Sequence, residues 1–273
     1  MDEMDNYLNS SLKSYFKEIT EVEGFLISVE GFIKLSHYQL SKTRKETDMI
    51  NALVTTYRDL SKSTEGPNLY TPEFCHKLTV SGFKKNIALI VSRECCFALS
   101  QAYEIFETYL KRTLGLFLFN NPSFISLLNK KNTPIPNNQQ GYAGFVDDLL
   151  RQSKNNKKLL WVLRQVSPFY SKHEVFNIWS FNLANWYDLL SEIRHAIVHA
   201  RQELTERVRT NIIQNQNIKI FERYYNAENS LTHSVIFTDR VRTAEQIHLM
   251  NSFAYLIFKA LSIEEGMDTT YQV

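Results

Sequence analysis

Apolar side chains recur every three or four residues along most of this chain, which is the spacing that gives an α-helix one buried face. Near the start, Leu8, Leu12 and Phe16 follow one another at four-residue intervals. Segments rich in glycine, proline and asparagine, at residues 61–72 and 120–144, predict loops. Between these loops the spacing predicts helices over residues 4–62, 93–118, 145–151, 158–166 and 181–207.

The spacing of apolar residues changes after the helix predicted over 181–207. Segments 218–221 and 235–238, separated by a polar turn, follow the pattern of a two-stranded β-hairpin. Residues 243–246 have the Thr-x-x-Gln form of a capping box, which predicts a last helix through about residue 263. The sequence therefore predicts an all-α fold, mainly a helical bundle, with one short β-hairpin between the 181–207 helix and the last helix.

The composition is typical of a folded domain and narrows the possible functions. The chain has 273 residues, is 44% apolar, and contains 31 basic and 29 acidic residues for a net charge of +2. This balance excludes a highly basic, histone-like polymer binder but allows a local basic groove. Three unclustered cysteines exclude a disulfide scaffold. The acidic N-terminus resembles no signal peptide, and no apolar run reaches the ~18 residues of a membrane span, so we expect a soluble, cytoplasmic protein.

The helix predicted over 181–207 carries a polar face with the groups needed for acid–base chemistry. His195 and His199 lie four residues apart, so their rings are neighbours on the helix surface. Arg194 precedes the first histidine and can reach toward the second. Two imidazoles and a guanidinium suit proton transfer at a phosphate. The alternative is an ordinary solvated face with two incidental histidines.

The segment Leu190 to His199 resembles the signature of the HEPN superfamily of small α-helical proteins. That signature is Arg, a polar residue, three further residues and His, and Arg194, His195 and His199 fill it. The segment Tyr103 to Leu110 is similar to the first core helix of many members. The resemblance covers about residues 86–265, so we expect a helical extension over 1–85 and a HEPN-like helical domain over 86–273.

The resemblance implies a metal-independent endoribonuclease without a cofactor, often a toxin or an antiviral effector. In such enzymes the RNA 2′-hydroxyl attacks the adjacent phosphate and leaves a 2′,3′-cyclic phosphate and a 5′-hydroxyl. By this resemblance His199 is the candidate base or acid, Arg194 holds the phosphate, and His195 orients the phosphate or assists proton transfer. The family usually forms homodimers with a composite site, so we expect a homodimer and, beyond it, a possible antitoxin or regulatory partner.

Basic residues near this helix are candidates for binding the RNA backbone. The substrate-binding candidates are Arg151, Lys154, Lys158 and Arg201. They belong to wider groups in which we also count Lys157, Arg164, Arg207 and Arg209. The alternative is ordinary surface charge.

Two other function classes stay open. Glu-x-x-His pairs at Glu73/His76, Glu192/His195 and Glu245/His248, with Glu104 and Glu107 as further carboxylates, could build a helical di-metal site. A non-catalytic HEPN-like interaction module is the other alternative. The His195/His199 spacing also occurs in zinc proteases, but Ala196 stands where their catalytic glutamate follows the first histidine.

Overall fold

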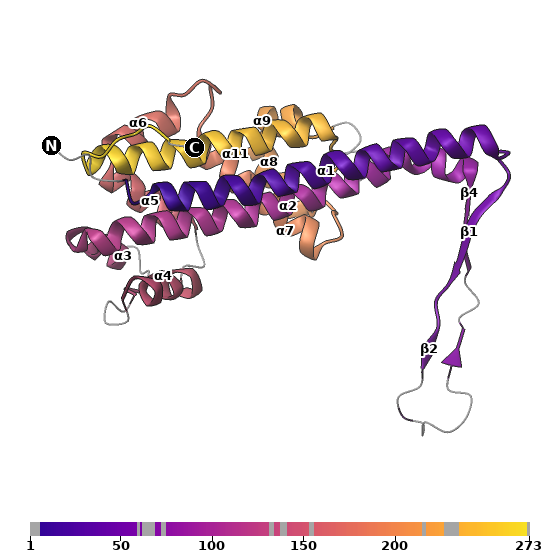
Figure 1. The fold of residues 1–273 in the computed structure, drawn as a ribbon, viewed down its shortest axis with the longest axis horizontal. Helices are drawn as coiled ribbons and strands as arrows, with labels where there is room; N and C mark the ends of the chain where they lie inside the picture. The colour runs from indigo at the N-terminus through magenta and orange to yellow at the C-terminus, as the bar shows by residue number, and fades with distance from the viewer. Residues whose placement is uncertain are drawn as a thin grey trace. The chain divides into compact units, whose positions relative to one another are not determined.

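The computed structural model describes residues 6–58, 61, 69–71, 75–130, 134–136, 141–152, 156–214, 217–226 and 235–271. The chain divides into two compact units (Figure 1). Unit 1 takes in the chain up to Leu26 and from Ser92 onward, and unit 2 runs from Ile27 to Val91. The boundary expected at residue 85 therefore lies within unit 2, and residues 6–26 of the expected extension pack with the C-terminal part of the chain.

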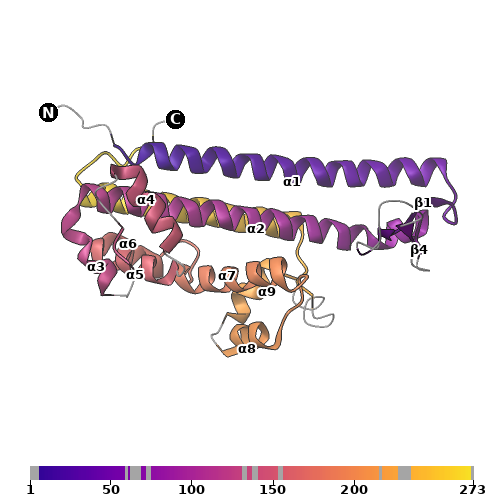
Figure 2. The same cartoon turned by 90° about the horizontal axis from the view of Figure 1, so that it is seen from below.

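Unit 1 is built from helices, which confirms the expected mainly helical class. The two longest, α1 (Asn9–Thr43) and α2 (Val80–Asn120), continue into it from unit 2. The last helix, α11 (Arg240–Glu264), packs along α2 (Figure 2). The remaining elements are η1 (Pro122–Phe124), α3 (Ser126–Asn129), α4 (Gly141–Gln152), α5 (Asn156–Val166), α6 (Pro168–Val175), α7 (Leu183–His199), α8 (Glu206–Gln214) and α9 (Ile218–Tyr224).

An aromatic cluster forms the centre of unit 1. The ring of Phe253 on α11 lies 5.2 Å from that of Phe106 on α2 and within 6.4 Å of Tyr170, Trp186 and Tyr187. All five side chains are almost completely buried. Rings at these distances add favourable contacts to the apolar area that they remove from water. The cluster joins α2, α6, α7 and α11 into one core, which fixes the position of α7, the helix that carries Arg194, His195 and His199.

Helix α7 is shorter than the helix expected over 181–207. Asn182 caps its N-terminus by accepting hydrogen bonds from the backbone N–H groups of Ala184 and Asn185. At the other end, the Gln202 N–H bonds to the Ala196 carbonyl, and Arg201 and Gln202 have φ of 52° and 68°. This left-handed turn provides a hydrogen bond to a carbonyl of the last helical turn and ends the helix. Arg201 therefore lies in a turn after α7 and not on the motif helix.

The β-hairpin expected over 218–238 is not where the sequence placed it. Residues 218–224 form α9, which buries Ile220, Phe221 and Tyr224 on one side. Val235 makes only an isolated bridge to Glu203. A short apolar run fits a helix or a strand equally well, and packing against α11 decides for the helix. Helix α11 also begins earlier than expected: Asp239 is its N-cap, and Thr243 is buried inside the helix.

The hairpin that does form lies in unit 2, and its first strands fall within the helix that was expected over residues 4–62. Strands β1 (Met49–Val54) and β4 (Cys75–Thr79) pair antiparallel, as do β2 (Tyr57–Arg58) and β3 (Leu69–Tyr70). The apolar spacing in residues 49–57 fits the period of a helix and that of a strand. Residues from 69 onward pair with this segment, and the pairing decides for the strand. Within the residues that the structure describes, no helix is long and apolar enough to cross a membrane.

Candidate active site

The motif residues lie on the exposed side of α7. The rings of His195 and His199 have centroids 4.7 Å apart, and both side chains are exposed. Ile193, Ala196 and Ile197 are buried on the opposite side of the helix. The amphipathic pattern of the sequence thus orients this helix as expected, and it brings the two imidazoles side by side at the surface.

Arg194 is held by a carboxylate from another helix. Its Nη2 donates to Oε1 of Glu104 on α2, and the two side chains form an ion pair. The Nε of Arg194 is buried and has no hydrogen-bond partner among the described residues. The guanidinium is therefore fixed at one end and retains a donor, an arrangement suited to holding an anionic group near His195.

Arg194 and His195 line a polar pocket of about 520 Å³. Its walls come from four helices that are far apart in the sequence: α2, α5, α7 and α8. The other lining residues are Tyr103, Glu107, Asn156, Lys157, Tyr187, Asp188, Ser191, Glu192 and Arg207. Polar groups dominate this list, so the pocket suits a polar ligand with both donors and acceptors.

Two stacked tyrosines form part of the pocket wall. The Tyr103 and Tyr187 rings lie 5.2 Å apart at an interplanar angle of 17°. The side-chain amide of Asn156 donates to both hydroxyls, at 3.3 Å to Tyr103 and 2.9 Å to Tyr187. Burial, together with the neighbouring Tyr103, holds the pKa of Tyr187 well above its ordinary value. Burial therefore favours the neutral form of the Tyr187 hydroxyl.

Carboxylates line the same pocket. Asp188 forms an ion pair with Lys157, whose Nζ lies 2.9 Å from the Asp188 Oδ2. Burial nevertheless raises the pKa of Asp188 above its ordinary value. The charge of Glu192 adds to this rise, and Lys157 opposes it. One oxygen of Glu192 and the side-chain oxygen of Asn156 are buried without a hydrogen-bond partner in the described part of the chain. Buried polar atoms are usually satisfied, so these atoms are suited to a bound polar group or water.

The expected substrate-binding residues do not all share this site. Arg151 is exposed and pairs with Asp148 on its own helix at 2.7 Å. Lys158 lies half-buried on α5, and Arg201 is exposed in the turn after α7. Lys154 lies outside the described residues.

Arg164, counted with the basic group, has a structural partner instead. It binds the buried carboxylate of Glu174 through two hydrogen bonds, of 2.5 and 2.9 Å. Lys157 and Arg207 are the basic residues of that wider group that line the pocket.

Sequence reasoning did not find Tyr103, Asn156 and Tyr187 as site residues. Asp188 lies seven residues, about two helical turns, before His195 on the motif helix, and this spacing is a partial signal for it. Asn156 lies in a polar stretch with no motif, and only the tertiary fold brings it to α7.

The described residues give the di-metal alternative no donor cluster. No group of three or more His, Cys, Asp or Glu side chains converges within the part of the chain that the structure describes. His76 lies on strand β4 and not on a helix, and its partner Glu73 is outside the described residues. The remaining Glu-x-x-His pairs, Glu192/His195 on α7 and Glu245/His248 on α11, are therefore not joined into one site.

Comparisons of the chain with protein-family models, with curated proteins and with solved structures give no significant match. The function must therefore be argued from the site itself.

Proposed function

We propose that this chain is a metal-independent endoribonuclease of the HEPN type, acting through Arg194, His195 and His199. The observation that carries the proposal is the pair of exposed imidazoles, 4.7 Å apart, beside an arginine anchored at the rim of a polar pocket. Imidazole can accept and donate a proton through its ring nitrogens, so one side-chain type can serve as base and as acid. The cyclisation of RNA needs only these groups and a cation for the phosphate.

In the proposed reaction the RNA 2′-oxygen attacks the adjacent phosphorus. His199 accepts the proton of the 2′-hydroxyl as the new O–P bond forms, and an acid returns a proton to the 5′-oxygen as its bond to phosphorus breaks. The products are a 2′,3′-cyclic phosphate and a 5′-hydroxyl, with no water consumed and no change of oxidation state. His195 orients the phosphate or donates the second proton, and in a homodimer a second copy of the motif helix completes the site.

Arg194 offsets the charge that builds on the phosphate in the transition state. Glu104 acts as a positioning residue because its carboxylate fixes the guanidinium from α2. Phosphate is a competing partner for that guanidinium, so substrate entry loosens the ion pair with the exposed Glu104 at small cost.

The pocket beside the motif supplies a place for the RNA itself. Lys157 and Arg207 bring positive charge to its lining, and its unpartnered polar atoms can bond to a base edge or a sugar hydroxyl. Arg151, Lys158 and Arg201 remain candidates for contacts with the backbone outside the pocket, and Lys154 remains a candidate from sequence. A toxin or antiviral role, and an antitoxin or other regulatory partner, belong to the proposal as what the HEPN resemblance implies.

The decisive experiment is cleavage of labelled RNA in EDTA, followed by analysis of the product ends. We expect wild-type protein to cut and to leave cyclic-phosphate and 5′-hydroxyl ends. Replacing His199 by alanine should lower the rate by about 10²–10⁴, the usual contribution of a general acid or base. Arg194→Ala should lower it comparably.

A matched control is available in the same chain. On α11, His248 follows Arg242 after five intervening residues, without a polar Asn, Asp or His directly after the arginine, and His248 is exposed. We expect His248→Ala to keep the wild-type rate. Cleavage that survives His199→Ala would show the catalytic assignment to be wrong. Activity that requires added iron or manganese would favour the di-metal alternative, and binding of RNA without any cleavage would favour the interaction module.

A further inference from the structure

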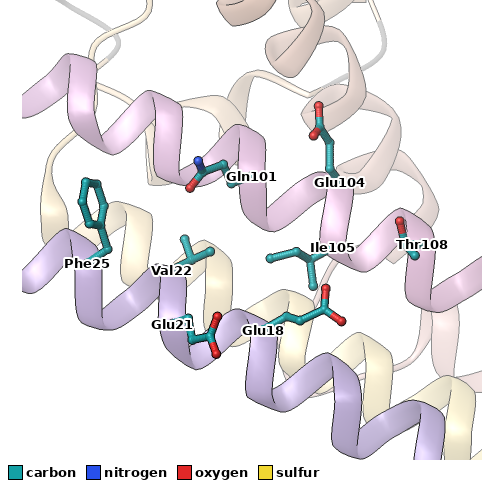
Figure 3. Close-up of a pocket in the computed structure, with 8 residues that line it drawn as sticks. All are labelled: Glu18, Glu21, Val22, Phe25, Gln101, Glu104, Ile105 and Thr108. Atoms are coloured by element: carbon teal, nitrogen blue, oxygen red, sulfur yellow. The ribbon is translucent and has the colours of Figure 1, made fainter.

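Two pockets of similar size in unit 1 differ in the charge of their linings. The α1 pocket, about 540 Å³ between α1 and α2, has glutamates and no basic residue among its described lining residues. Figure 3 shows these glutamates, which are Glu18, Glu21 and Glu104. The α7 pocket is the polar pocket of about 520 Å³ that Arg194 and His195 line, and Lys157 and Arg207 add positive charge to it. Because RNA carries a negative charge at each phosphate, the α7 pocket suits a nucleotide and the α1 pocket repels one.

Two side-chain oxygens in the lining of the α7 pocket accept no hydrogen bond from the described residues. They are Oδ1 of Asn156 and Oε2 of Glu192. The Asn156 amide nitrogen donates to the hydroxyls of Tyr103 and Tyr187, so both of its hydrogens are engaged and the oxygen is left without a partner. Buried acceptors are costly to leave unpaired. A ligand for this pocket therefore needs hydrogen-bond donors.

Glu192 differs from the other carboxylates of the α7 pocket because it lacks a cationic partner. Glu107 pairs with Lys111 at 2.6 Å, and Asp188 pairs with Lys157 at 2.9 Å. Within the residues that the structure describes, no lysine or arginine pairs with Glu192. The last torsion of a glutamate side chain is soft, so its carboxylate can turn both oxygens toward a ligand. Such a carboxylate binds best to two parallel N–H groups.

Among the four RNA bases, guanine offers this pair of donors. Its Watson–Crick edge carries N1–H and the N2 amino group side by side. Adenine and cytosine each place a ring acceptor beside their amino group, and uracil has one N–H between two carbonyl oxygens. A carboxylate oxygen that faces one of these acceptors is repelled by it. Proteins read single-stranded RNA on this edge, so the unpaired carboxylate favours guanine.

The position of Glu192 on α7 suits a base next to the reacting phosphate. It precedes His195 by three residues and His199 by seven, which is about 4.5 Å and about 10 Å along the helix axis. At 100° per residue the three side chains fall within an arc of about 60°. A base and its neighbouring phosphate are separated by one sugar, so a single nucleotide can reach from the carboxylate to the imidazoles.

We propose that the α7 pocket binds a guanine base next to the scissile phosphate, with the Glu192 carboxylate accepting hydrogen bonds from guanine N1 and N2. The inference rests on the proposed function, which places the phosphate at Arg194, His195 and His199. The Asn156 oxygen is a further acceptor in the same pocket. Glu192 is then a residue that determines specificity, and the substrate class is RNA with guanosine at the cleavage site.

The first test compares cleavage of labelled RNAs that differ in one base at a defined position. We expect cleavage next to guanosine to be roughly 5- to 150-fold faster than next to the other three nucleosides, the discrimination that one good bidentate contact gives. Inosine, which lacks the N2 amino group, should lose most of this advantage. The control is 7-deazaguanosine, which keeps N1–H and the N2 amino group and should lose none. Equal cleavage at all four bases, or a preference for another base, would overturn the proposal.

The second test changes the residue and follows the ratio of cleavage at guanosine to cleavage at adenosine. Glu192→Gln replaces one acceptor by a donor, which matches N1 and the N6 amino group of adenine. We expect the ratio to fall by roughly tenfold or more. Partial unfolding lowers both rates equally and cannot move the ratio. Glu21→Gln, the same change at an exposed glutamate of the α1 pocket, is the matched control and should leave the ratio unchanged. A guanosine preference that survives Glu192→Gln would overturn the assignment.

A binding measurement separates this inference from the ribonuclease proposal. Calorimetry with the full-length His199→Ala protein should show tighter binding of guanosine monophosphate than of inosine monophosphate, and adding Glu192→Gln should remove the difference. This result, together with a wild-type protein that does not cut RNA, would support the guanine site and overturn the ribonuclease proposal. Equal binding of the two nucleotides would overturn the guanine site. RNA cleavage without base preference would do the same and leave the ribonuclease proposal in place.

Discussion

Units 1 and 2 contain parts of the same two helices, yet the apolar residues of these helices are mostly buried in unit 1 and mostly exposed in unit 2. In unit 1 the apolar side of α1 buries Leu12, Tyr15 and Ile19, and Tyr15 packs against Phe106 and Tyr109 of α2. In unit 2 Val80 is the only buried residue among those described, while large apolar side chains of α1 and β1 are exposed. The helices are similar in composition, so burial depends on how many other elements surround them.

The comparison teaches that helical patterning does not by itself create a core. Unit 1 surrounds α1 and α2 with further helices, above all α11, whereas unit 2 offers only short two-stranded ribbons. Two-stranded ribbons are marginally stable alone and leave strand edges unpaired. Substitutions in unit 1 should therefore lower the stability of the fold, and comparable substitutions in unit 2 should change it little.

The largest difference is expected for aromatic truncation. Phe253→Ala removes the ring at the centre of the unit 1 cluster and should lower the free energy of unfolding by about 3–5 kcal/mol. Phe32→Ala, at an exposed side chain of α1 in unit 2, should change it by less than about 0.5 kcal/mol. Urea denaturation of both variants measures the contrast, and equal losses would contradict the division into a cored and a coreless unit.

The second-largest loss of stability is expected at a buried ion pair in unit 1. Arg164→Met leaves the carboxylate of Glu174, which is 2% exposed, without its cation, and should cost about 3 kcal/mol. Tyr170 continues to donate to that carboxylate at 2.9 Å, which limits the loss. Arg151→Met at an exposed pair is the matched control and should cost less than about 1 kcal/mol. Thermal or urea unfolding of the two variants compares them directly.

The N-cap of α11 should have an effect of about 1 kcal/mol. Asp239 accepts a 2.9 Å hydrogen bond from the Arg242 N–H and a second contact from the Arg242 side chain. Asp239→Ala removes both and should lower stability by about that amount. Asp239→Asn keeps the capping acceptor and should recover most of it. If alanine and asparagine behave alike in denaturation, the cap is not the source of the effect.

The smallest effect is expected at Asp188, and it depends on pH. The folded-state pKa of Asp188 is raised above its ordinary value near 3.8, mainly by burial, so ionisation is harder in the folded chain than in the unfolded one. Below the ordinary pKa Asp188 is protonated in both the folded and the unfolded chain, and burial of the neutral carboxyl costs no ionisation. As the pH rises through the raised pKa, the buried carboxylate lowers the free energy of unfolding. Asp188→Asn should therefore gain stability relative to wild type between pH 3.5 and pH 6. Urea denaturation at both pH values checks the sign, and a relative loss would contradict it.

The site was predictable from sequence only as far as one helix face reaches. The spacing of Arg194, His195 and His199 places them together on α7, since i and i+4 side chains are neighbours on any helix. The pocket was not predictable, because Tyr103 and Asn156 meet Tyr187 only when α2 and α5 pack on α7. Likewise, no motif indicates that Glu104 would bind Arg194, because the two residues are 90 positions apart in the sequence.

Long segments with a clear helical spacing of apolar residues were predicted as helices correctly. Short apolar runs were assigned to the wrong type of element. The helix expected over 158–166 appears as α5, and the helix expected over 93–118 forms the larger part of α2, which begins earlier, at Val80. Residues 218–224 and 49–54 were assigned the wrong way round between strand and helix, since each run is too short for its period to decide. The end of α7 at His199 also escaped prediction, because Arg and Gln rarely adopt the left-handed conformation that Arg201 and Gln202 have here.

The sequence by itself determined the helical class of this protein and the polar face of α7. Each of these follows from spacing along the chain, which local backbone geometry converts directly into a shared face. Only the tertiary structure decided where the hairpin lies, which groups complete the pocket around Arg194, and that α1 is covered at one end and exposed at the other. Those outcomes depend on contacts between residues far apart in sequence, where competing packings of the same short segment differ by little until a neighbouring element is in place.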